Sequence, residues 1–284
     1  SCDELNCFQN WNLPGIFPWI FGIFQAFEAN TEIRGNYDVL ERRLPVAAKD
    51  AMCKGLVLWP ESSHADTLML EYLAANAWNP SQIRIADFLE TFCRKRYRAE
   101  EYVAMTPVWR ALLPLIRRQY WRQNQTMPVR GFLYPDYTFD ILRSVMSDLN
   151  IELLENHRAI TKEFNQAIRC APECLRLLGK MNYMELTPHA ARDWIDLARC
   201  AVARVSNFAC GVLALRMEAW RNGEDDGQAV LDYAGKIGEL IRTEKDLLGA
   251  HPDYSLCDSL RRLRTGGDIH PDFEFKLKGN AENA

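Results

Sequence analysis

The sequence has no long apolar run and no large excess of one charge. Its richest apolar stretch, residues 13–27, contains two prolines and a glutamine, and it is shorter than the roughly 20 apolar residues that cross a bilayer. The formal net charge is −4, with lysines and arginines dispersed among the acidic residues. Nucleic-acid binding calls for a basic patch or stripe, so we expect neither a membrane span nor a nucleic-acid partner.

Motifs that identify several large enzyme classes are also missing. The chain has no phosphate-binding glycine motif, no serine nucleophile elbow and no histidine pair of the metalloprotease type. Its five histidines are far apart, and its nine cysteines are scattered. Cys170 and Cys174 are one helical turn apart, but no second cysteine or histidine pair is spaced to complete a zinc site. We therefore expect no metal site and mainly buried free thiols.

The amino-terminal part of the sequence predicts a small α/β unit. Short apolar runs at residues 16–24 and 56–59 flank an amphipathic stretch at residues 38–52. This order is typical of a strand, a helix and a second strand, and such a connection implies that the two strands are parallel.

After about residue 65 the apolar residues recur at helical spacing. The first such stretch is Thr67–Ala77. Thr187-Pro188 predicts the start of a long helix, and Asn222-Gly223 predicts its end after Arg221. The sequence therefore predicts a mainly α fold with a small α/β part, in which long helices form a bundle.

The stretch Lys54–Glu61 is the most informative part of the sequence. A short apolar run there ends in Trp59, Pro60 and Glu61, and a proline tends to end a strand because it cannot donate to the hydrogen-bond ladder. A glutamate at the carboxyl end of a buried strand lies where a (β/α)8 barrel carries its catalytic groups. The alternative is a solvent-exposed glutamate in the turn after an ordinary strand.

Polar and aromatic residues that suit a sugar ligand accompany this glutamate. The candidate site residues are Glu61, His64, Trp19, Trp59, Glu28 and Asn30. Carboxylates and amides bind sugar hydroxyls, aromatic rings cover the apolar faces of sugars, and glycosidases divide their chemistry between two carboxyl groups. The alternatives are core packing for the tryptophans and solvent exposure for Glu28.

At these residues the chain resembles a known family. Pro18-Trp19-Ile20-Phe21 and Phe27-Glu28-Ala29-Asn30 are similar to an aromatic strand and a following Phe-Gly-Gly-Asn segment in that family. Pro60-Glu61 is similar to the strand end that carries its nucleophile, and Trp78 and Arg96-Tyr97 match the ends of the two helices that follow. The family is that of the α-N-acetylglucosaminidases, a group of glycoside hydrolases.

The resemblance implies a retaining exo-glycosidase that hydrolyses terminal, non-reducing α-linked N-acetylglucosamine. Glu61 would be the nucleophile, Asp3 would contact sugar hydroxyls, and the acid/base would lie on an earlier strand upstream of Ser1. No metal and no organic cofactor is implied, and the partner would be a glycan that ends in N-acetylglucosamine. The resemblance is compatible with a secreted, periplasmic or lysosomal protein.

The resemblance also implies a domain organisation. Residues 1–75 would form the last strands and a helix of a (β/α)8 TIM-type barrel, and residues 76–264 an α-helical domain. Independently of the resemblance, the glycine pair, the proline and the charged end of residues 265–284 predict a loose tail. Because such a barrel would be incomplete, we expect the chain to be the C-terminal portion of a longer enzyme. A homo-oligomer formed through the helical domain is also compatible with the sequence.

Two other functions remain as alternatives. The first is a different exo-glycosidase on the same barrel, because Ser62-Ser63-His64 stands where the family has Gly-Ile after its nucleophile. The second is a non-catalytic α-helical carbohydrate-binding or scaffold protein.

Overall fold

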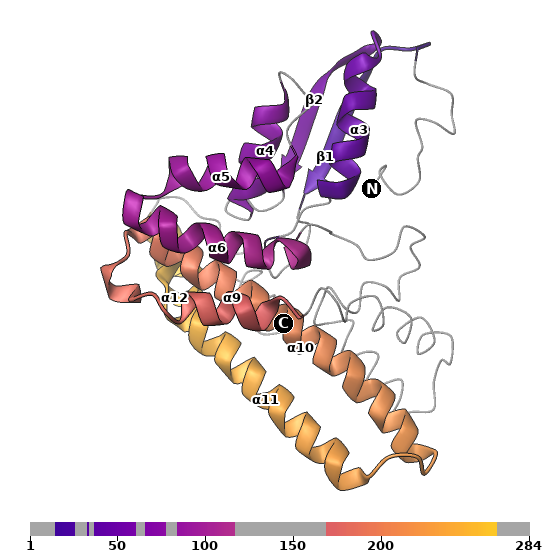
Figure 1. Cartoon of the computed structure of the whole chain (residues 1–284), viewed down its shortest axis with the longest axis vertical. Coiled ribbons are helices and arrows are strands. Elements are labelled where there is room, and N and C mark those ends of the chain that lie inside the picture. Colours follow the sequence, from indigo (N-terminus) through magenta and orange to yellow (C-terminus); the bar gives the residue numbers. More distant parts are fainter. Residues whose placement is uncertain are drawn as a thin grey trace.

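The computed structural model describes residues 15–25, 33, 37–60, 66–77, 84–116 and 169–265 of the chain. These residues are mainly helical and include a parallel sheet of two strands. Figure 1 shows the sheet at one end of the molecule and the longest helices at the other. The mainly α fold with a small α/β part is therefore confirmed.

The sheet has the strand–helix–strand form that the apolar pattern predicts. Strand β1 (Trp19–Gln25) and strand β2 (Cys53–Pro60) pair in parallel, and helix α3 (Tyr37–Lys49) connects them. Side chains alternate across a strand, so Phe21 and Ile23 are buried against the helices while Ile20, the residue before Phe21, is exposed.

Helices make up most of the remaining described residues. Helices α4, α5 and α6 span Thr67–Ala77, Ile85–Arg96 and Ala99–Ile116. Helices α9, α10, α11 and α12 span Ala171–Leu178, Pro188–Arg221, Gly227–Gly249 and Leu256–Thr265. Short 3-10 helices, η2 and η3, span Tyr183–Glu185 and Pro252–Tyr254. The predicted helix over Thr67–Ala77 is confirmed.

The longest helix, α10, begins and ends where the sequence predicts. The Thr187 hydroxyl accepts a hydrogen bond from the amide of Ala190 (3.3 Å), and Pro188 occupies a first-turn position at which no amide donor is needed. At the other end Gly223 has a φ of 77°, a backbone conformation that residues with a Cβ rarely adopt. The chain therefore leaves the helix at this glycine.

Most of the buried residues form one core. It runs from Phe21 in β1 to Ala201 in α10 and includes residues before and after position 75. A series of ring contacts, with centroids 5.2–6.5 Å apart, crosses this core from α3 to α6 through Tyr37, Tyr72, Phe88, Phe92 and Trp109. The α/β part and the helices that follow it therefore pack together.

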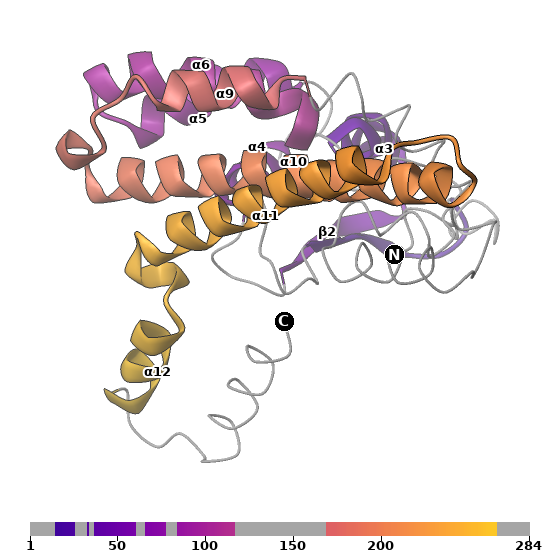
Figure 2. The same ribbon diagram turned by 90° about the horizontal axis from the view of Figure 1, so that it is seen from below.

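The second half of α10 and helix α11 form an arm with a smaller core of its own. Cys210 and Leu213 from α10 pack against Val230 and Ile237 from α11. Figures 1 and 2 show the two helices side by side, with α12 beyond the end of α11. Within the described part of the chain, no helix has both the length and the apolar character that a membrane span requires.

A buried carboxylate joins α5, α6 and α10. Asp193 in α10 accepts two hydrogen bonds from the Arg96 guanidinium (2.5 and 2.9 Å) and one from the Tyr97 hydroxyl (2.6 Å). The Trp109 indole in α6 donates in turn to the Tyr97 oxygen (2.9 Å). Burial and the charge of Asp193 raise the pKa of Tyr97 well above its ordinary value, so the hydroxyl stays protonated and remains a donor.

Replacing Asp193 with alanine is expected to lower the free energy of unfolding by about 3–5 kcal/mol, because the mostly buried Arg96 guanidinium loses its counterion. Urea denaturation of the two proteins measures the difference. The matched control is Glu173→Ala, which removes a similar pair with Arg176 from the exposed surface of α9 and should lower the free energy of unfolding far less, because solvent screens an exposed ion pair. An equal decrease in the free energy of unfolding in the two variants would contradict the role of Asp193 in holding α5, α6 and α10 together.

The described cysteines are free, and many of them are buried. Those in the core are Cys93, Cys174, Cys200 and Cys210, whereas Cys257 is exposed. Burial raises the pKa of Cys93 to about 12 and that of Cys210 to about 11. The prediction of buried free thiols is confirmed for these four residues.

In the native protein, iodoacetamide is expected to alkylate Cys257 much faster than Cys93, Cys174 or Cys200. The thiolate is the reactive form, so burial suppresses the reaction both by blocking access and by raising the thiol pKa. Peptide mass spectrometry over time measures each site, and a denatured sample is the control in which all of them react. Fast native labelling of Cys93 would contradict the packing of α5 against α6.

Candidate active site

The candidate residues follow the carboxyl ends of the two strands. Strand β1 ends at Gln25 and strand β2 at Pro60, and these two residues are partners in the parallel register. The connection from β1 to α3 and the connection from β2 to α4 therefore start side by side at one edge of the sheet. The predicted site residues that lie outside the described part of the chain are Glu28, Asn30, Glu61, His64 and Asp3.

The structure places Trp19 at the opposite edge of the sheet. It is the first residue of β1 and pairs with Cys53, whereas the carboxyl end of the strand is at Gln25. At about 3.3 Å per residue the two ends are about 20 Å apart. The Trp19 indole donates a hydrogen bond to the Asp50 carboxylate (2.9 Å), and its ring packs against the core. Trp19 therefore lies at the end of the sheet away from the carboxyl edge and contacts Asp50 and the core, and its predicted contact with a sugar stays a prediction.

The backbone of Trp59 does lie near the carboxyl edge. It pairs with Phe24, one position before the end of each strand. The Trp59 side chain lies outside the described part of the structure, so its predicted contact with a sugar stays a prediction.

Asp66 and Tyr37 are described residues that lie where the two connections end. Tyr37 is the first residue of α3, and Asp66 immediately precedes α4. The Tyr37 hydroxyl donates to the Asp66 carboxylate (3.4 Å), and both residues are buried. Sequence analysis missed this pair. An aspartate directly before a predicted helix is a signal for an N-cap, but the sequence carries no signal for its tyrosine partner.

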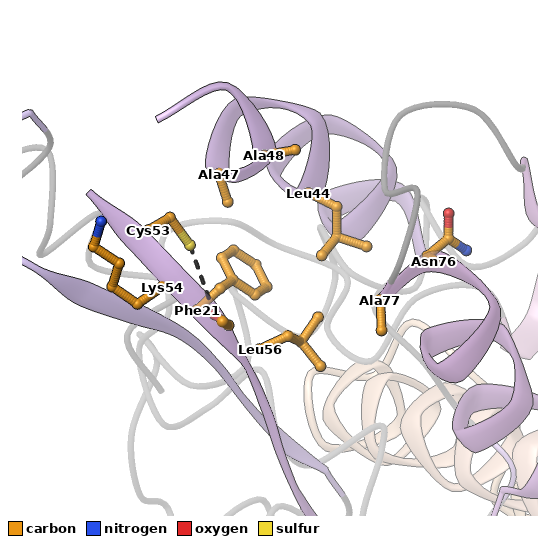
Figure 3. A pocket seen from close by; sticks show the side chains of 10 residues that line it. Phe21, Leu44, Ala47, Ala48, Cys53, Lys54, Leu56, Asn76 and Ala77 are labelled. Atoms are coloured by element: carbon orange, nitrogen blue, oxygen red, sulfur yellow. Dashed lines mark hydrogen bonds between the residues drawn. The ribbon is translucent and has the colours of Figure 1, made fainter. Parts of the chain in front are cut away.

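A small pocket lies toward the amino end of the sheet. Its volume is about 280 Å³, and the residues that line it include Phe21, Leu44, Ala47, Cys53, Leu56 and Ala77. In Figure 3 the Cys53 thiol lies on the same side of the strand as Phe21, and the Lys54 side chain extends away from them. The lining has no carboxyl or imidazole group, so this pocket does not offer the two carboxyl groups that a glycosidase uses. In the described residues, no three His, Cys, Asp or Glu side chains are arranged to hold a metal ion.

No protein-family model, curated protein or solved structure matched the chain. The family resemblance therefore stays a prediction that rests on the motifs quoted from the sequence. The structural observation that bears on this resemblance is that β1 and β2 end at residues that are partners in the sheet, Gln25 and Pro60.

Proposed function

We propose that this chain contributes the nucleophile of a retaining exo-α-N-acetylglucosaminidase, with Glu61 in that role. The observation that carries the proposal is the parallel register in which Gln25 and Pro60 are partners. It brings the starts of two connections together, one carrying Glu28 and Asn30 in its sequence and the other carrying Glu61. A catalytic site assembled from neighbouring strand ends is the arrangement of a (β/α)8 barrel.

The surface of the sheet supports a larger barrel. Parallel sheets in α/β proteins are covered on both faces, and here α3 and α4 cover only the face that carries Phe21 and Ile23. On the other face the Ile20 side chain is 61% exposed and that of Val57 is 41% exposed. Further strands beside β1 or β2 would turn this apolar face into the interior of a barrel.

The proposed reaction is a double displacement. A Glu61 carboxylate oxygen forms a bond to the anomeric carbon as the bond to the leaving oxygen breaks, and a second carboxyl group donates its proton to that oxygen. The second group then removes a proton from water, whose oxygen attacks the anomeric carbon and releases the sugar and the Glu61 carboxylate. Retention requires the two carboxyl groups to lie about 5–5.5 Å apart. Glu28 and Asn30 would bind sugar hydroxyls.

Glu61→Gln is expected to reduce turnover of an aryl α-N-acetylglucosaminide by several orders of magnitude, because the amide has the same shape and cannot act as the nucleophile. The assay uses the protein expressed from its complete natural reading frame, and the melting temperature checks the fold. The matched control is Glu100→Gln, which alters an exposed glutamate in the first turn of α6 and should leave turnover unchanged. Near-normal hydrolysis by Glu61→Gln would overturn the assignment.

The location of the acid/base is tested with the chain as printed. If this group lies on an earlier strand, the 284-residue chain is expected not to hydrolyse the same aryl glycoside. Clear turnover would instead mean that a carboxyl group of this chain, such as Glu28 or Asp3, is the acid/base, and Glu28→Gln and Asp3→Asn would then identify it.

A panel of aryl glycosides separates the proposed activity from that of another exo-glycosidase. The family expectation is a preference for the α-linked N-acetylglucosaminide, and a preference for another sugar would support the alternative. A non-catalytic helical binding or scaffold protein is favoured by one observation, the packing of Trp19 against the core and Asp50. It predicts no turnover of any member of the panel, whichever residue occupies position 61.

A further inference from the structure

We propose that Asp66 and Tyr37 are positioning residues of this active site. Their hydrogen bond joins the ends of the two connections that carry Glu28, Asn30 and Glu61. The inference rests on the proposed function for its catalytic part, whereas the joining of α3 to α4 can be tested without any substrate.

The contact between Tyr37 and Asp66 is buried, and the Asp66 carboxylate accepts two hydrogen bonds. Asp66 is 1% exposed, and its Oδ1 atom accepts hydrogen bonds from the Met69 amide (3.0 Å) and from the Tyr37 hydroxyl (3.4 Å). The first bond caps α4, and the second reaches the first residue of α3. Burial and the Asp66 charge raise the pKa of Tyr37 well above its ordinary value, so the hydroxyl keeps the proton that it donates.

The backbone of Asp66 is held in an uncommon conformation. Among the described residues other than glycine, Asp66 is the one with a positive φ, which is 54°. Aspartate tolerates this left-handed conformation better than most side chains, but the conformation persists only where the surroundings hold it. The hydrogen bonds of its carboxylate, together with the bond from the Leu70 amide to its carbonyl oxygen (3.2 Å), supply such surroundings.

Each connection is therefore tied to the other at both ends. They start at the partners Gln25 and Pro60, and they finish at the hydrogen-bonded pair Tyr37 and Asp66. The rings reinforce the second tie, because Tyr37 packs edge-to-face on Tyr72 in α4 with centroids 5.4 Å apart.

The first connection is also tied to the helical part of the protein. Ile33, the described residue within it, is buried, and its carbonyl oxygen accepts a hydrogen bond from the Cys200 thiol in α10 (3.4 Å). These contacts hold the first residue of α3, the residue before α4 and Ile33 in place against the core. Displacement of a catalytic group by about 1 Å can cost about 100-fold in rate, so these contacts bear directly on turnover.

The test uses four substitutions in the protein expressed from its complete natural reading frame. Tyr37→Phe removes the donor, and Asp66→Gly removes the carboxylate while accommodating the positive φ. Asp66→Asn keeps the shape, the cap and an acceptor for Tyr37, so it is the conservative variant. Asp226→Gly is the matched control, because the Asp226 carboxylate caps α11 through the amides of Gln228 and Ala229 on the distant arm.

With an aryl α-N-acetylglucosaminide, Tyr37→Phe and Asp66→Gly are expected to lower kcat by about 10- to 100-fold, with KM changed by less than about threefold. Asp66→Asn should restore kcat to within about threefold of the unsubstituted protein. Asp226→Gly should lower the melting temperature without changing kcat. Unchanged kcat in folded Tyr37→Phe and Asp66→Gly proteins would overturn the positioning role.

Hydrogen exchange without substrate tests the tie between the helices. Tyr37→Phe is expected to speed amide exchange in the first turns of α4, and Asp66→Gly to speed it in the first turns of α3, whereas Asp226→Gly should affect neither. A response confined to the substituted helix would overturn the tie. Absence of turnover in the unsubstituted protein would overturn the proposed function and the catalytic part of this inference, and the exchange result would still decide the structural part.

Discussion

The parallel pairing of β1 with β2 is the constraint on which the rest of the candidate site depends. Two adjacent strands that run the same way need a crossover, and α3 supplies it on the face that carries Phe21 and Ile23. Because Gln25 and Pro60 are partners, both strands also release their connections at the same edge. An antiparallel pair would have placed the starts of the two connections at opposite edges.

Buried carboxylates occur where separate elements meet. Asp66 accepts from α3 and α4, Asp193 accepts from the end of α5 and the residue after it, and Glu101 in α6 accepts from the amide and hydroxyl of Thr187 (2.6 and 3.0 Å) before α10. Burial of a charge is costly unless hydrogen bonds compensate for it, and each of these groups has several. Apolar contacts tolerate small sliding movements, whereas these directional bonds specify how the elements meet. The hydrogen bond between Tyr37 and Asp66 is therefore one of several contacts in the described core in which a buried carboxylate joins separate elements.

Features set by neighbouring residues could be predicted. The cap at Thr187, the first-turn Pro188 and the glycine at 223 define α10 because each acts within one helical turn. The end of the first helix could not be predicted from local pattern. The amphipathic stretch extends over residues 38–52, but α3 ends at Lys49. The Asp50 carboxylate accepts a hydrogen bond from the Met52 amide (2.9 Å), and this turn returns the chain to β2 before the apolar pattern ends.

The parts of the candidate site also divide into features set by neighbouring residues and contacts between residues far apart in the sequence. The sequence by itself determined the residue types, the strand that ends at Pro60 and the order in which Glu28, Asn30 and Glu61 follow the strands, because these depend on local composition and spacing. Only the tertiary structure decided that Trp19 lies at the far edge beside Asp50, and that Tyr37 meets Asp66. Those contacts join residues about 30 positions apart, separated by 31 in the first pair and 29 in the second. The crossover of a parallel sheet brings such residues together, and no local pattern in the sequence encodes their meeting.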